Sequence, residues 1–213
     1  MVVEQTLDVQ TGAENIGNKE KILRAAIDLF SQKGYSGVSV REIAAAVGIK
    51  AASIYNHYSG KEGILDDIVA LFRQLLHEQV YPAFERDELP DVEAFIKRIT
   101  QANDAFFSVP LHAQIGGIVF REQFHNEGVR RMLLEELIVS PRREIAGFFE
   151  ELMRNGKMRK VDPVFAAKEY HAFYVYRFYE NSLSQTFGET DLEASEREHA
   201  GHVRMFLDCY SCE

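Results

Sequence analysis

Small side chains open the last of three short helices that the sequence predicts between Lys19 and Tyr58. Ala51, Ala52 and Ser53 stand at that position, and a helix that begins with small residues can enter the major groove of DNA without steric collision. The N-terminal residues of such a helix are the ones that reach the edges of the bases. The chemistry that this stretch could perform is therefore the reading of duplex DNA.

The neighbouring residues supply the helices that would hold this segment in place. The first helix, Lys19 to about Lys33, ends before Gly34 and has an apolar stripe made of Ile22, Ala26, Leu29 and Phe30. Ser39 and Glu42 have the spacing of a capping box, in which each side chain binds a backbone N–H of the first turn, so they open the second helix. Before Gly48 ends that helix, its inward residues are Ile43, Ala44 and Val47. The third helix runs from Ala51 to about Tyr58, and the whole forms a helix-turn-helix unit.

Four short motifs agree in order and spacing with the signature of a known family. They are Ser39-Val40-Arg41-Glu42-Ile43-Ala44, Val47-Gly48-Ile49, Ile54-Tyr55-Asn56-His57-Tyr58 and Lys61-Glu62. With these motifs, about the first third of the chain resembles the TetR family of transcriptional regulators. The resemblance implies an all-α fold of about nine helices, with a three-helix DNA-binding domain over residues 18–62 and a helical ligand-binding and dimerisation domain over residues 63–213. Residues 1–17 are polar and aperiodic, so we expect a disordered N-terminal arm there.

The resemblance also implies roles for individual side chains. Ser39 and Arg41 would contact phosphates or nearby bases, while Tyr55 and His57 would hold the DNA backbone. Lys61 would meet a phosphate at the start of the fourth helix. The residues that would face base edges are Lys50, Ala51, Ala52, Ser53 and Asn56. Two of them depart from the family, which often has Ser or Thr in place of Lys50 and Gly in place of Ala52, so the operator sequence stays open.

The rest of the chain has the periodicity of further helices. We expect them at about residues 61–81, 91–108, 111–125, 127–155 and 163–187, and from 191 to near the C-terminus. At Ser140-Pro141 the fourth of these either kinks or gives way to a new helix. Gly116 and Gly117 lie inside a helical pattern, where each costs up to about 1 kcal/mol relative to alanine. Close packing or space for a ligand would explain them, and close packing is the preferred interpretation.

A small-molecule pocket within the helical body is implied by the resemblance. The candidates to line it are Phe106, Phe107, Ile115, Val119, Phe120, Phe124, Phe173, Tyr174 and Arg177. The effector would be apolar or aromatic, anionic compounds included, and no cofactor is expected. The alternative is that these aromatic residues form an ordinary core, and that Arg177 is a surface or salt-bridge residue.

The helix at residues 163–187 is apolar on nearly every side between Tyr170 and Tyr179, which indicates that it is covered on more than one face. In the family, the last two helices pair with their copies in a homodimer. The residues expected at that interface are Tyr170, Tyr176, Ala200, Val203, Phe206, Leu207 and Tyr210. A two-fold dimer would set two recognition helices about 34–36 Å apart on a near-palindromic operator.

Two pairs near the C-terminus, His199 with His202 and Cys209 with Cys212, have residue types that bind zinc. The seven residues from His202 to Cys209 span about 10 Å of straight helix, too far for one ion, so we expect no metal site. No catalytic motif is convincing either. The alternative to a regulator is a helical interaction module or enzyme with an incidental helix-turn-helix, which would show no salt-dependent affinity for DNA.

Charge is unevenly distributed along the chain. Its net charge is −9, but seven lysines and arginines against four acidic residues give residues 18–62 a net charge of +3. A local positive face within an acidic protein favours specific over nonspecific DNA binding. No run reaches the ~18 apolar residues of a membrane span, and the N-terminus lacks the pattern of a secretory signal. We therefore expect a cytoplasmic protein with no membrane partner.

Overall fold

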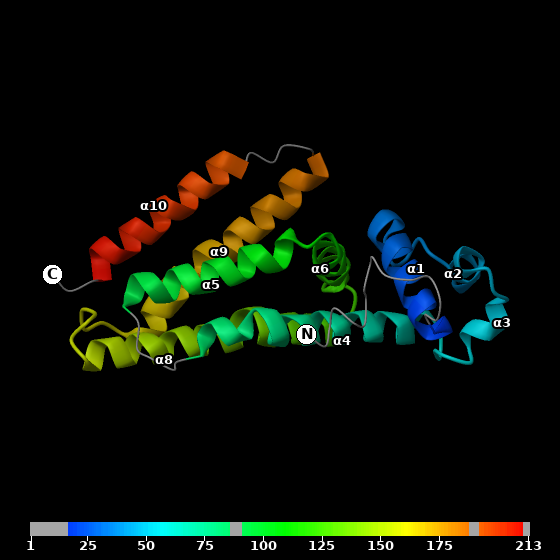
Figure 1. Cartoon of the computed structure of the whole chain (residues 1–213), viewed down its shortest axis with the longest axis horizontal. Coiled ribbons are helices and arrows are strands. Elements are labelled where there is room, and N and C mark those ends of the chain that lie inside the picture. Colours follow the sequence, from blue (N-terminus) through cyan, green and yellow to red (C-terminus); the bar gives the residue numbers. More distant parts are fainter. Residues whose placement is uncertain (1–16, 86–90, 188–191, 211–213) are drawn as a thin grey trace. The chain divides into compact units, whose positions relative to one another are not determined.

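Helices account for all the regular elements in the computed structural model, which describes residues 17–85, 91–187 and 192–210 (Figure 1). These residues contain ten α-helices, one 3-10 helix at Tyr81–Phe84 and one π-helix at Leu134–Val139. The α-helices are α1 (Asn18–Lys33), α2 (Val40–Val47), α3 (Ala51–Ile54), α4 (Lys61–Gln79), α5 (Val92–Ser108), α6 (Pro110–Glu122), α7 (Glu127–Leu133), α8 (Ser140–Arg154), α9 (Pro163–Phe187) and α10 (Leu192–Tyr210). The all-α prediction is confirmed, whereas the arm predicted at residues 1–17 lies almost wholly outside the described residues.

The chain folds into two compact units. One contains the described residues up to Gln79 together with Phe106–Leu133, and the other contains Val80–Ala105 and the described residues from Leu134 onward. The unit that holds the helix-turn-helix therefore extends beyond the domain boundary predicted at residue 62. The physical reason is that α1 packs against α4 and α6 as well as against α2, and α4 packs against α6, so these helices share one core.

Aliphatic and aromatic side chains fill the core of the first unit. α1 buries Ile22, Ala26, Ile27 and Phe30, and α4 buries Ile64, Leu65, Ile68 and Phe72. A Cβ atom at Gly116 of α6 would lie 3.5 Å from ring carbons of Phe72 and Phe107, an ordinary van der Waals distance, and one at Gly117 would meet nothing within 4 Å. Close packing therefore does not explain why α6 carries two glycines.

Stacked aromatic rings form much of the core of the second unit. The rings of Phe95 and Phe148 lie 3.6 Å apart, and Phe149 stacks against Phe206 at 5.4 Å. Tyr170 packs edge-on against both Phe149 and Phe206. These contacts join α5, α8, α9 and α10 into one body.

The π-helix resolves the alternatives at Ser140-Pro141. A new helix, α8, begins at Ser140 with Pro141 in its first turn, and Val139 occupies the cap position. Proline has no N–H for a helical hydrogen bond, so the preceding turn adopts the wider π geometry. The Ser140 hydroxyl donates to the Glu135 carboxylate at 3.0 Å. Ser140 is thus a residue of the helix and does not cap it.

Candidate nucleic-acid interface

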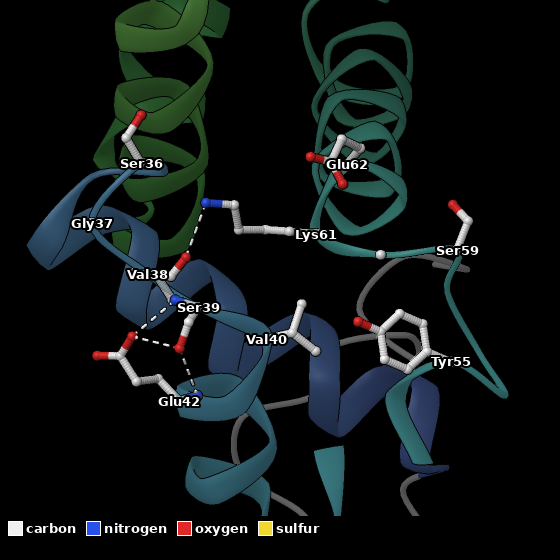
Figure 2. Close-up of a pocket in the computed structure, with 11 residues that line it drawn as sticks. Ser36, Gly37, Val38, Ser39, Val40, Glu42, Tyr55, Ser59, Lys61 and Glu62 are labelled. Atoms are coloured by element: carbon white, nitrogen blue, oxygen red, sulfur yellow. Dashed lines mark hydrogen bonds between the residues drawn. The ribbon is translucent and has the colours of Figure 1, made fainter. Parts of the chain in front are cut away.

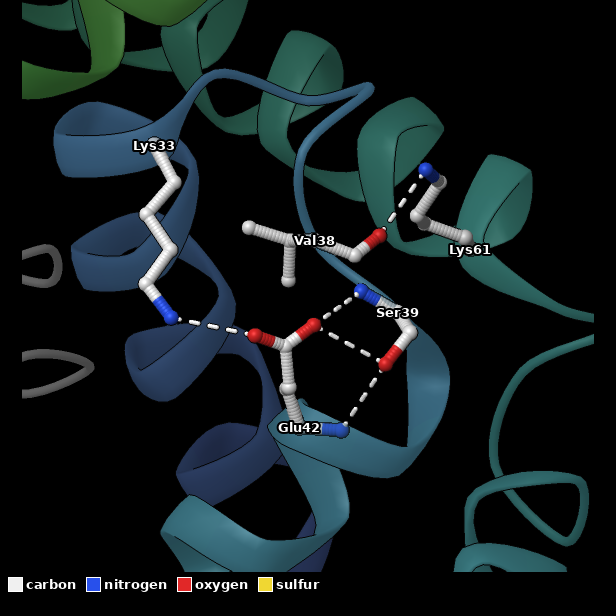
Figure 3. Close-up of polar contacts among 5 residues, drawn as sticks. All are labelled: Lys33, Val38, Ser39, Glu42 and Lys61. Carbon is white, nitrogen blue, oxygen red and sulfur yellow. Dashed lines mark hydrogen bonds and ion pairs between the residues drawn. The ribbon is translucent and has the colours of Figure 1, made fainter.

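Ser39 and Glu42 fix the start of α2. The Ser39 hydroxyl accepts the Glu42 N–H at 3.2 Å, and the Glu42 carboxylate accepts the Ser39 N–H at 2.8 Å (Figure 3). The capping box predicted from the sequence is confirmed. Lys33 of α1 donates to the other oxygen of Glu42 at 3.0 Å, which ties α1 to α2. The Ser39 N–H and then the Lys33 ammonium lower the pKa of Glu42 to about 2.

The third helix is shorter than predicted, because α3 ends at Ile54 and not near Tyr58. Beyond it the N–H of His57 binds the carbonyl of Ile54, and the N–H of Asn56 binds that of Ser53, so the chain continues as a turn. Ile54 and Tyr58 are both buried, as predicted. Packing of both side chains into the same core turns the backbone inward after one helical turn. Lys50 precedes α3, and its side chain does not cap the helix.

Most of the side chains predicted to contact DNA are exposed in the first unit. Tyr55 is 61% exposed, and Ala51 and Ser53 are half-buried. The others on α2, on α3 and in the flanking turns are exposed, namely Ser39, Arg41, Lys50, Ala52, Asn56 and His57. Arg41 and Lys50 form no ion pair within residues 17–85, 91–187 and 192–210. These two cations therefore remain available for the predicted phosphate or base contacts.

An open groove of about 560 Å³ lies between the starts of α2 and α4 (Figure 2). Residues 36–40 form one wall, Tyr55 contributes from the turn after α3, and residues 59–62 form the other wall. The groove contains both the capping box and Lys61. The helix N-termini that were expected to approach the DNA backbone thus lie on either side of the same depression.

Lys61 uses its ammonium group within the protein. It donates to the carbonyl of Val38 at 2.9 Å (Figures 2 and 3). It also donates to the carbonyl of Tyr35 at 2.9 Å and lies 4.2 Å from the centre of the Tyr35 ring. Lys61 thus acts as a brace that fastens the connector between α1 and α2 to the start of α4, and its phosphate contact stays a prediction. The sequence could not reveal this brace, because the connector carbonyls that attract the ammonium lie more than twenty residues away along the chain.

A second lysine brace holds the other side of the unit. Lys19 forms an ion pair with Asp67 at 2.8 Å and lies 5.2 Å from the centre of the Tyr58 ring. Burial and then the Asp67 carboxylate raise the pKa of the Tyr58 hydroxyl well above its usual value. Burial and then the Glu62 carboxylate likewise raise the pKa of Tyr35 to about 12. Both tyrosines stay neutral across the physiological range and act as structural contacts.

The residues predicted to line a ligand pocket are divided between the two units. Phe106, Ile115 and Val119 are buried in the first unit, and Phe106 stacks on His112 at 4.6 Å. Phe107 and Phe120 are half-buried there. Phe173, Tyr174 and Arg177 are half-buried in the second unit. Phe124 is 71% exposed, so its assignment to an enclosed pocket is wrong: it lies in the turn after α6.

Two residues predicted at a dimer interface belong to the core of their own unit. Tyr170 is 1% exposed and Phe206 is 3% exposed, and they pack on each other, so these assignments are corrected. Tyr176 is 63% exposed and Ala200 is exposed, while Val203, Leu207 and Tyr210 are half-buried. Sequence reasoning missed four exposed apolar side chains on the same two helices, namely Val164, Phe165, Tyr179 and Met205. Spacing alone could have found Phe165 and Tyr179, because they fall on one face of α9 with Tyr176.

Among the described residues, no group of three or more histidine, cysteine, aspartate or glutamate side chains could hold a metal ion. Cys209 is exposed, and Cys212 lies outside the described residues. His202 stacks on Phe173 at 4.1 Å, and one ring nitrogen lies 3.3 Å from the Tyr170 carbonyl. Burial lowers the pKa of His202, as expected for a packed imidazole. Among the helices of the described residues, none is long and apolar enough to span a membrane.

Comparisons with known proteins agree with this geometry. A model of bacterial regulatory proteins of the tetR family matches residues 22–68, and a model of the C-terminal domain of AefR-like transcriptional repressors matches residues 95–212. The probable HTH-type transcriptional regulator YttP of Bacillus subtilis is 42% identical over 57 residues, which cover 27% of this chain and only 28% of that regulator.

Solved structures extend the likeness to nearly the whole chain. A complex of SmeT with triclosan is 16% identical and covers 92% of each chain, with a TM-score of 0.71. A complex of AibR with isovaleryl coenzyme A and operator DNA is 22% identical and covers 89% of this chain and 97% of that one, with a TM-score of 0.62. These two likenesses concern the fold. Because the second family model spans more than half of the sequence, the chain belongs to the TetR family of transcriptional regulators.

Proposed function

We propose that this regulator is a repressor that binds a near-palindromic DNA operator as a homodimer and is released by a small apolar or aromatic effector. The observation that carries the DNA-binding part is the exposed surface around α3. Arg41 faces solvent from α2, whose N-terminus is capped, and the side chains around α3 that face solvent are Lys50, Tyr55, Asn56 and His57. The Lys19 and Lys61 braces hold the unit that carries them. A rigid, locally positive surface led by small residues fits a major groove. The family consists of regulators, which agrees with the expectation that the chain is no enzyme.

Exposed apolar side chains on the last two helices support a homodimer. Phe165 is 57% exposed and Tyr176 is 63% exposed on α9, and Met205 is 60% exposed on α10. Large apolar groups that gather on one surface mark an interaction site more often than an ordinary solvated face. A second copy of this chain, related to the first by a two-fold axis, would cover these groups and would place two copies of α3 on successive major grooves.

The effector and the location of action are also proposals. The structures of SmeT with triclosan and of AibR with isovaleryl coenzyme A show those two proteins with small molecules that carry apolar groups. The aromatic residues expected to line a pocket here, Phe107, Phe120, Phe173 and Tyr174, are only half-buried. An apolar effector bound within either unit would bury more of the aromatic surface of that unit. The protein would act in the cytoplasm, where the bacterial chromosome lies.

Selection from a random pool of duplex DNA tests the proposal. We expect enrichment of a near-palindrome, and binding of the winning sequence should weaken as salt rises. Lys50→Met should weaken this binding, because Lys50 is exposed beside α3. Arg131→Met is the matched control, because Arg131 is exposed and pairs with Glu127 on α7. If the protein, refolded to remove any bound ligand, enriched no sequence and bound DNA weakly at low salt, the proposal would be refuted.

A further inference from the structure

The last turn of α6 meets the last turn of α1. One guanidinium nitrogen of Arg121 donates to the carbonyl of Ser31 at 3.1 Å and to that of Phe30 at 3.3 Å. Both carbonyls lie in the last turn of α1, and that of Ser31 is one of the final carbonyls, which lack an N–H partner within the helix. The N–H of Gly34 also binds the Phe30 carbonyl. Arg121 therefore caps α1 from another helix.

The charge of Arg121 suits this position. The C-terminus of a helix carries partial negative charge, which a cation stabilises. The basic residue in the last turn of α1 itself is Lys33, but its ammonium pairs with Glu42 of α2. The cation that binds the final carbonyls of α1 thus comes from α6.

Helix α1 lies between α6 and the pair formed by α2 and α3 (Figure 1). Its last residue, Lys33, is followed at once by the connector to α2, and Lys61 of α4 binds two carbonyls of that connector. Two cations, one from α6 and one from α4, thus hold the backbone between Phe30 and Val38. This backbone sets the direction in which the chain enters α2.

We propose that Arg121 is a positioning residue for DNA binding: it holds the end of α1 against α6 and thereby sets how α2 and α3 are presented to DNA. The proposal rests on the proposed DNA-binding function. Arg121 itself contacts the protein backbone and not the operator. Without it, the DNA-competent arrangement is populated less, and apparent affinity falls in proportion to that population.

The test compares Arg121→Met with the wild-type protein on the selected operator across a salt series. We expect roughly tenfold weaker binding, which corresponds to about one tenth of the molecules in the competent arrangement. The slope of affinity against salt should stay unchanged, because no phosphate contact is lost. Arg131→Met removes the same charge from α7 and should bind like the wild type. Arg121→Lys keeps a donor and should recover part of the affinity.

Hydrogen exchange of the free protein gives a second measurement. Amides of α2 should exchange faster in Arg121→Met, while those of α8 should not change. Because Arg121 is exposed, its replacement leaves no cavity. If Arg121→Met nevertheless melted below the assay temperature, Arg121→Gln would replace it in the same comparison.

Three results would overturn the role of Arg121. They are wild-type affinity in the variant, a salt slope reduced by about one, which would indicate a phosphate contact, and unchanged exchange in α2. Weak, salt-independent binding by the wild-type protein would instead refute DNA binding itself.

Discussion

Replacement of Lys61 by methionine separates a structural brace from a phosphate contact. The ammonium donates two hydrogen bonds of 2.9 Å to backbone carbonyls and lies 4.2 Å from the Tyr35 ring. A hydrogen bond to a charged group contributes about 1.5–3 kcal/mol, and a cation over an exposed ring about 0.5–1 kcal/mol. Lys61 is only half-buried, so solvent screening reduces the total to about 1–2 kcal/mol. Methionine keeps most of the apolar stem, so the loss isolates the ammonium group.

Thermal unfolding without DNA measures this loss. A change of 1 kcal/mol shifts the Tm of a protein of this size by about 2–4 °C, so we expect Lys61→Met to melt about 2–8 °C lower than the wild type. Lys50→Met is the matched control, because Lys50 lies in the same unit, is exposed and precedes α3. It should leave the Tm unchanged and lower the salt slope of operator binding by about one.

The opposite pattern would refute the reasoning. Lys61→Met could instead melt like the wild type and lower the salt slope of operator binding by about one. The two bonds to carbonyls would then contribute nothing to stability, and the ammonium would contact a phosphate, as the family resemblance implies.

Four further substitutions test other parts of the chain. Ser39→Ala should lower the free energy of unfolding by about 1 kcal/mol in urea titration, because the cap of α2 is lost, and an unchanged midpoint would contradict this. Glu42 has a folded pKa of about 2, below its ordinary value of 4.5, so its stabilising contribution is complete above about pH 4.5 and is lost as pH falls through about 2. The difference in Tm between Glu42→Gln and the wild type should therefore shrink towards pH 2, and a constant difference would count against the capping box. Gly117→Ala should raise the free energy of unfolding by up to about 1 kcal/mol, since a Cβ there meets nothing within 4 Å; destabilisation would show hidden crowding. Tyr176→Glu should shift the protein from dimer to monomer in light scattering, and an unchanged mass would exclude Tyr176 from the interface.

Local chemistry made the helix-turn-helix predictable. Ser39, Glu42 and Gly48 act within a few residues of their own positions, so their spacing alone indicates where α2 begins and ends. The end of α3 was less predictable, because burial of Tyr58 in the shared core stops the helix earlier than periodicity suggests. Tertiary packing, which no local pattern encodes, decides such boundaries.

The main errors in the predictions concerned which face of an apolar helix packs into the protein's own core. Periodicity shows that α9 is apolar on several sides, but it cannot say which side meets the protein's own core. Tyr170 packs on Phe149 and Phe206 of its own unit, whereas Tyr176, six residues later, faces solvent. Which side of α9 is buried depends on where α8 and α10 pack, and that is set by the whole fold.

The number of basic residues also overstates how many side chains of the first unit are available to bind DNA. Of the seven basic side chains in residues 18–62, four are engaged within the unit: Lys19 with Asp67, Arg24 with Glu20, Lys33 with Glu42, and Lys61 with backbone carbonyls. Exposed cations with no such contact in the described part of the chain are Lys21, Arg41 and Lys50. Few counterions would be released per protomer, so long-range attraction contributes modestly to affinity. Under the proposed function, discrimination between sequences would then come chiefly from close contacts at the start of α3, where small side chains would allow the backbone to approach the bases.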